Sequence, residues 1–134
     1  MESLIEQLDL GASVRLTGWI PREQLEQVYR CAFAVVYPST FEGFGLPVLE
    51  ALAAGIPTAC SNIEPLAGLA GEAALLFDPA DEDAMLHAIE RVTTDAGLRT
   101  RLAEEGPRRA AQFPWQRTAE QTLEALRAAA SLNM

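Results

Sequence analysis

The fold of this 134-residue chain is decided by the stretch Phe33-Ala-Val-Val-Tyr-Pro-Ser-Thr-Phe-Glu42-Gly-Phe-Gly-Leu-Pro-Val-Leu-Glu50. Its first five residues are apolar and predict a strand that is buried on both faces. A glycine-bearing loop follows, and the residues after it predict a short helix that Gly55 and Pro57 terminate. Such a unit directs backbone N–H groups and the positive end of a helix dipole at one spot, where phosphate usually binds. Glu42 and Glu50 flank this spot, and carboxylates accept hydrogen bonds from ligand hydroxyls.

Outside this stretch, the sequence predicts alternating strands and helices. Strands are expected at Ser13–Thr17, Phe33–Tyr37, Ile56–Cys60 and Ala74–Phe77. Helices are expected at Met1–Asp9, from Arg22 to Ala32, after Glu50, at Pro65–Ala70, from Asp81, from Asp95 to about Glu105, and after Pro114. This alternation indicates an α/β fold with an open, parallel, Rossmann-like sheet of about four strands flanked by helices. Ligands of such sheets bind at the carboxyl ends of the strands, where the Glu42–Glu50 loop is expected to lie.

Length and composition limit the class of protein. With 134 residues, the chain is expected to form a single domain over residues 1–134. A net charge of −9 argues against nucleic-acid and anionic-membrane partners, because both require clustered cations. No apolar run is long enough for a membrane span, so a cytoplasmic location is expected. Cys31 and Cys60 lie among apolar residues and are expected to be buried free thiols.

Together with Gly55-Ile-Pro57, the central stretch closely resembles the donor-binding signature of retaining glycosyltransferases of family 4. The segments Val14–Gly18, Gly71–Pro79 and Phe113–Trp115 resemble the adjoining parts of the same family, so the resemblance covers nearly the whole chain. It implies the GT-B fold, in which two Rossmann-like domains face each other across a cleft. The chain would correspond to the C-terminal part of the donor-binding domain.

The resemblance also implies a role for each residue of the site. Glu42 is similar to the carboxylate that faces the donor sugar near the reacting carbon, and is the catalytic candidate. Glu50 is similar to the carboxylate that binds the two ribose hydroxyls, and Ile20 matches a position near the nucleotide base. The loop whose backbone approaches the sugar and diphosphate corresponds to Gly43, Phe44, Gly45 and Leu46. Glycine permits this approach where a side chain would collide with the ligand.

Each of these residues also has a structural alternative. Glu50 can be placed in the first turn of its helix, where it would merely complement the dipole, and Glu42 can be a solvated loop acid. His87 is expected at the surface or at the boundary of the core and not as a catalytic base, and Trp115 is expected in the core. The acidic residues 81–83 are interpreted as a helix start, so no metal site is predicted.

Several parts of a complete family member have no counterpart here. The N-terminal acceptor domain is missing, as are the first two strands of the donor domain with the Arg and Lys that neutralise the diphosphate. The chain contains no lysine, so we expect no transfer by the chain alone. Without those strands, the Phe33–Tyr37 strand would expose an apolar edge. Three arrangements would explain this exposed edge: the strand pairs directly with the Ser13–Thr17 strand, two copies form a homodimer through the edge, or the chain is cut from a longer protein. We favour the last, which also allows a homodimer.

The sequence thus predicts part of an enzyme that transfers a hexosyl group from a nucleotide sugar to an acceptor with retention of configuration. GDP-mannose is the favoured donor, although UDP- and ADP-linked sugars share the signature, and no further cofactor is expected. The alternative is a non-catalytic nucleotide-binding or interaction module of the same half-fold. A sugar-nucleotide epimerase is disfavoured by the spacing of the two carboxylates.

Overall fold

The computed structural model describes residues 2–131 and consists of two compact units, Met1–Arg30 and Cys31–Met134. The first unit contains helix α1 (Glu2–Gln7) and nearly all of helix α2 (Arg22–Cys31). None of its described residues is fully buried. Because little apolar surface is removed from water there, the packing that holds the fold together lies in the second unit.

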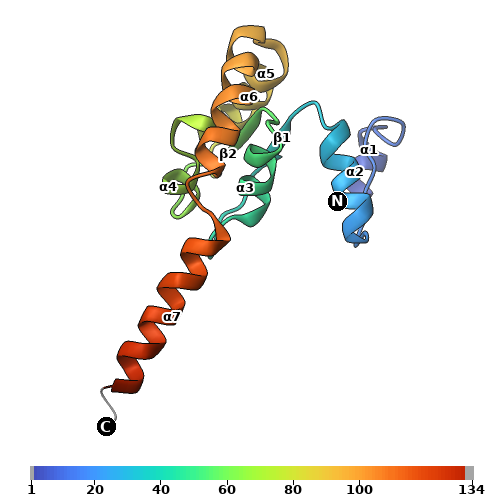
Figure 1. The fold of residues 1–134 in the computed structure, drawn as a ribbon. Helices are drawn as coiled ribbons and strands as arrows, with labels where there is room; N and C mark the ends of the chain where they lie inside the picture. Colours follow the sequence, from blue (N-terminus) through green and yellow to red (C-terminus); the bar gives the residue numbers. More distant parts are fainter. Residues whose placement is uncertain (1, 132–134) are drawn as a thin grey trace. The chain divides into compact units, whose positions relative to one another are not determined.

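The second unit is built on a parallel sheet of three strands in the order β1-β2-β3. Figure 1 labels the first two of them. The three strands are β1 (Val35–Tyr37), β2 (Thr58–Ser61) and β3 (Leu75–Phe77). Tyr37 is in register with Cys60, which is in register with Leu76, so the strands end at a common edge. The predicted parallel α/β architecture is confirmed. Strand β1 lies at one edge of this sheet, and a homodimer through that edge stays a prediction.

The expected strand at Ser13–Thr17 is wrong, which reduces the number of strands from four to three. No described segment pairs with these residues, and the side chains of Val14 and Leu16 remain exposed. A strand exists only where a neighbour satisfies its backbone groups, so alternation of apolar residues was insufficient on its own.

Helices cover the sheet on both faces. They are α3 (Leu46–Ala53), α4 (Leu66–Ala70), the short 3₁₀ helix η1 (Gly71–Ala73), α5 (Glu82–Thr94) and α6 (Ala96–Ala110), and they are followed by α7 (Trp115–Ser131). Asp81 and Asp95 cap α5 and α6 as expected, each accepting a hydrogen bond from the backbone three residues further on. Helix α6 continues past Glu105 through Pro107. Its packing against α3 stabilises it by more than the loss of the hydrogen bond that the proline nitrogen cannot donate.

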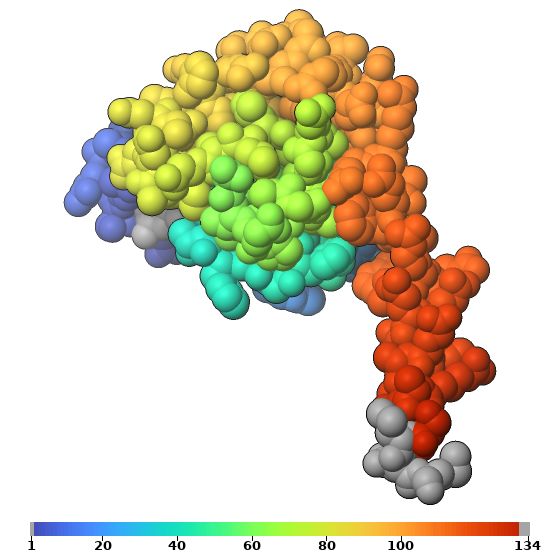
Figure 2. Space-filling view, turned by 90° about the vertical axis from the view of Figure 1, so that its left-hand side faces the viewer, coloured from blue at the N-terminus to red at the C-terminus, as the bar shows by residue number. Residues whose placement is uncertain are grey.

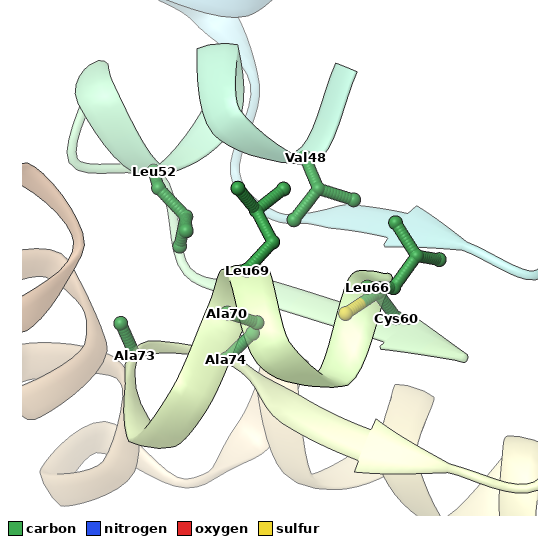
Figure 3. Close-up of a cluster of buried hydrophobic side chains, with 8 residues drawn as sticks. All are labelled: Val48, Leu52, Cys60, Leu66, Leu69, Ala70, Ala73 and Ala74. Atoms are coloured by element: carbon green, nitrogen blue, oxygen red, sulfur yellow. The ribbon is translucent and has the colours of Figure 1, made fainter. Parts of the chain in front are cut away.

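The core has two layers, one on each face of the sheet. Figure 3 shows the first layer, in which side chains of α3 and α4 converge over Cys60 of β2. Ala59, the neighbour of Cys60, faces the second layer with residues of α5 and α6. Successive residues of β2 thus serve opposite layers, as the pleat of a strand requires. Cys60 is buried as predicted, whereas Cys31 is exposed because it ends α2 outside both layers.

Helix α7 has an apolar face, but no described residue of it is buried. Figures 1 and 2 show this helix running away from the rest of the second unit. Trp115, at its start, has an exposed fraction of 74%, so the expectation that it lies in the core is wrong. Its large apolar ring favoured burial, but no element packs over it. His87 is exposed on α5, as expected.

Candidate functional site

The loop between β1 and α3 carries four of the seven predicted site residues, Glu42 to Gly45, and two more, Leu46 and Glu50, lie on α3 itself. The loop starts at the carboxyl end of β1, where open α/β sheets bind their ligands. Glu42 and Glu50 are both half-buried, Gly45 is buried, and Phe44 and Leu46 are exposed. Ile20 belongs to the first unit, and its role near a nucleotide base stays a prediction.

Gly45 forms the start of α3. Its φ of 97° lies in the left-handed region, and its backbone carbonyl accepts a hydrogen bond from the Leu49 N–H group at 3.1 Å. A Cβ at this position would meet the side chains of Leu66 and Leu69, so the loop is pressed directly against α4. Since glycine has no side chain, the N-cap residue of α3 makes no side-chain hydrogen bond to the first N–H groups, and Pro47 in the first turn has no N–H group of its own. This end of the helix can therefore receive an anion.

Glu42 is held by a residue that the sequence did not single out. The hydroxyl of Tyr37, the last residue of β1, donates a hydrogen bond to Oε1 of Glu42. Between them, the hydroxyl of Ser39 donates to the backbone carbonyl of Phe41 at 2.8 Å and shapes the turn. A tyrosine at the end of a strand gives no signal by itself, because its partner five residues later is set by the path of the loop. Glu42 is therefore not a freely solvated loop acid.

Glu50 lies in the second turn of α3, because the helix begins at Leu46. The first turn contains no acidic residue. The alternative that placed Glu50 in the first turn is wrong, since the loop ends earlier than expected and α3 begins at Leu46, and favourable interaction with the helix dipole is confined to the first turn.

Phe44 connects the loop to the end of α6. Its ring meets Phe113 edge to face, with centroids 6.2 Å apart. The guanidinium of Arg109 lies 5.2 Å from the centre of the Phe113 ring and donates hydrogen bonds to the backbone carbonyls of Leu69 and Gly68. Arg109 thus ties the end of α4 to the aromatic pair that supports the loop.

A cavity of about 500 Å³ opens beside this aromatic pair. It is lined by Phe44, Leu46, Leu49, Gln112, Phe113, Pro114, Trp115, Arg117, Thr118 and Gln121. Neither Glu42 nor Glu50 lines it, so the cavity is separate from the two carboxylates.

Two further properties concern the described residues as a whole. Within residues 2–131, no three His, Cys, Asp or Glu side chains are grouped so that they could hold a metal ion. In the same range, no helix combines the length and apolarity that crossing a membrane demands.

Comparison with known proteins places this geometry in context. The sequence profile of the family described as "Glycosyl transferases group 1" matches residues 1–109. The O-antigen chain mannosyltransferase B of Escherichia coli is 38% identical over 122 residues, which cover 91% of this chain and 32% of that protein. The D-inositol 3-phosphate glycosyltransferase of Corynebacterium urealyticum is 36% identical over 129 residues, or 95% of this chain and 30% of that protein.

Among solved structures, sucrose-phosphate synthase from Thermosynechococcus elongatus superimposes with a TM-score of 0.86 at 33% identity. The match covers 98% of this chain and 34% of the synthase. It confirms the predicted Rossmann-like α/β fold of the GT-B type. The chain spans about a third of the length of the relatives that it matches.

Proposed function

The chain belongs to the glycosyl transferases group 1 family, and on this premise we propose that it is the donor-binding part of a retaining, family-4 hexosyltransferase. The enzyme transfers a hexosyl group from a nucleotide sugar to an acceptor hydroxyl. GDP-mannose is the donor that we favour. Two similar proteins, from Escherichia coli and Mycolicibacterium hassiacum, are named mannosyltransferases, which supports this choice.

The observation that carries the proposal is the start of α3. Its helix begins at a glycine with no side-chain cap, directly after a parallel strand. The diphosphate of a nucleotide sugar carries negative charge and accepts several hydrogen bonds, so it satisfies both the dipole and the free N–H groups. In this reading, Gly43 to Leu46 bring their backbone close to the diphosphate.

The two carboxylates bind the neutral parts of the donor. Glu42, which precedes the glycines, contacts the sugar hydroxyls and balances charge near the anomeric carbon. Glu50 lies one helical turn after Leu46, the first residue of α3, and accepts hydrogen bonds from the ribose hydroxyls. A carboxylate can accept from two neighbouring hydroxyls at once, and each such charged hydrogen bond contributes about 1.5–3 kcal/mol.

The chain alone is proposed to bind the donor and not to turn it over. In the transfer, the bond from the anomeric carbon to the diphosphate oxygen breaks, a bond to the acceptor oxygen forms, and the acceptor's proton passes to the departing diphosphate. The leaving diphosphate needs cations to stabilise its charge, and the lysine that the resemblance places beside it has no counterpart here, because this chain contains arginines but no lysine. Transfer of a labelled sugar by the purified chain would contradict this part of the proposal.

Isothermal titration calorimetry, in which GDP-mannose or UDP-glucose is added to the protein, tests the site. The titration is made with this chain and with the longest natural form of the protein. Replacing Glu50 by Ala is expected to weaken the binding of the preferred donor at least about tenfold, because a charged acceptor is lost. Glu104→Ala is the matched control, since Glu104 is exposed on α6, away from the loop. Absence of binding by the unaltered protein would favour the interaction module instead.

A further inference from the structure

Tyr37 occupies a position from which it can control Glu42. It is the last residue of β1, and its hydroxyl donates to Glu42 Oε1 across the turn that joins the strand to the loop. The hydrogen bond therefore connects the rigid sheet to the carboxylate that is expected to face the sugar.

The phenol ring is fixed from the sheet side. The backbone of Tyr37 is in register with that of Cys60, and the hydroxyl of Ser61 donates a hydrogen bond to the Tyr37 carbonyl at 3.4 Å. The ring itself is half-buried and packs against the core layer formed by α3 and α4. Packing on this side restricts the rotamers of the ring, so the hydroxyl is held at a defined place.

The carboxylate of Glu42 depends on this one contact. Within the described chain, Glu42 has no other hydrogen bond or ion pair, and its Oε2 atom accepts none. One oxygen is thus anchored by the protein, while the other is left to a ligand. Without the anchor, the flexible Glu side chain would have to be ordered by the ligand itself, at a cost in binding affinity.

We infer that Tyr37 is a positioning residue for sugar recognition, which holds the Glu42 carboxylate in the orientation that accepts hydrogen bonds from the donor's hexosyl group. This inference rests on the proposed function, because it assigns the sugar to Glu42. It goes further in predicting that the sugar and the nucleotide are recognised by separable parts of the site. Tyr37 serves the sugar, whereas Glu50 serves the ribose.

The test compares two variants, Tyr37→Phe and Tyr29→Phe, with the unaltered protein. Tyr29 is the matched control because it is the other of the two tyrosines and lies on α2. Each protein is titrated with GDP-mannose and UDP-glucose, and with GDP and UDP. For each variant, the affinity for the nucleotide sugar is divided by the affinity for the free nucleoside diphosphate, GDP or UDP. Partial unfolding lowers both affinities by the same factor, so this ratio is valid even for a destabilised variant.

We expect Tyr37→Phe to weaken binding of the preferred nucleotide sugar by about tenfold, corresponding to one lost charge-assisted contact, and to leave the diphosphate affinity unchanged. Tyr29→Phe should change neither. If Tyr37→Phe leaves the ratio unchanged while the unaltered protein binds both ligands, the inference is overturned and the proposed function stands. If the unaltered protein binds none of the four nucleotides, the proposed function fails and the inference fails with it.

Discussion

The side chain of Leu66 occupies the place that a Cβ atom on Gly45 would need. An ideal Cβ built on Gly45 would overlap Leu66 Cδ2 and would lie 3.3 Å from Leu69 Cδ2. The start of α3 and the first turn of α4 therefore approach each other so closely that a side chain on residue 45 would displace Leu66. This contact also fixes the proposed anion-binding end of α3 in the core of the second unit.

Gly45→Ala is accordingly expected to lower the free energy of unfolding by about 1–3 kcal/mol, because alanine is strained at a positive φ and Leu66 must move. Urea unfolding followed by circular dichroism measures the change. Gly43→Ala is the control, since a Cβ added to Gly43 would have no neighbour within 4 Å and the φ of this residue is not positive. Equal midpoints for the two variants would show that the contact with α4 contributes little.

The packing of α3 against α6 leads to a second prediction. A Cβ on Gly106 would lie 2.8 Å from the backbone carbonyl oxygen of Leu52, and a backbone atom cannot rotate away. Gly106→Ala should therefore cost about 1–3 kcal/mol of stability through overpacking. Gly97→Ala, on the same helix, meets only ordinary contact at 3.5 Å and should be neutral or stabilising by up to about 1 kcal/mol. Thermal unfolding of both variants tests the difference, and a stabilised Gly106→Ala protein would refute the close packing.

The sequence predicted those parts of the fold that are determined by residues close together in the chain. The strand before Glu42, the glycine loop and the helix caps at Asp81 and Asp95 each follow from a few neighbouring residues, and the structure contains them. The strand at Ser13–Thr17 failed because strand formation needs a partner, which no local pattern supplies.

The site was predictable to a similar extent. The glycines and two carboxylates were identified from spacing and resemblance, and the structure places them in one loop and the helix after it. The contacts of Tyr37 with Glu42 and of Phe44 with Phe113 were not predictable, because they depend on how the loop folds back and on where α6 ends. The burial of Trp115 was overestimated for the same reason, since burial depends on what packs above a residue.

Arg109 provides a third prediction. Its Nε donates to the Leu69 carbonyl at 2.8 Å, and one terminal nitrogen donates to Gln112 at 2.8 Å. Arg109→Ala leaves the last carbonyls of α4 without this partner. We expect the free energy of unfolding, measured with urea, to fall by about 1–3 kcal/mol. Arg109→Lys should recover less than half of it, because an ammonium group lacks the planar fork.

The adjacent Arg108 is the control for this experiment. It is exposed, and its one ion pair, with Glu105, joins two solvated side chains at 3.4 Å. Arg108→Ala should change stability by less than about 0.5 kcal/mol. If Arg108→Ala were as destabilising as Arg109→Ala, the effect would come from helix α6 in general and not from the contacts with α4.

Cys60 gives the chain a pH dependence in the alkaline range. Burial in the core layer raises the pKa of its thiol from 9.0 to about 12, because the thiolate is poorly solvated there. The unfolded chain releases this proton near pH 9, whereas the folded chain retains it up to about pH 12. The folded state therefore binds more protons in this window, and its stability must fall as the pH rises through it.

Between pH 8 and pH 10.5, this single group should lower the free energy of unfolding by about 2 kcal/mol. Urea unfolding of the unaltered protein and of Cys60→Ala across this range isolates the contribution, since all other titrating groups are shared. Cys31→Ala should keep the full pH dependence, because the Cys31 thiol is exposed. Identical slopes for Cys60→Ala and the unaltered protein would mean that the thiol is accessible to water in the folded state.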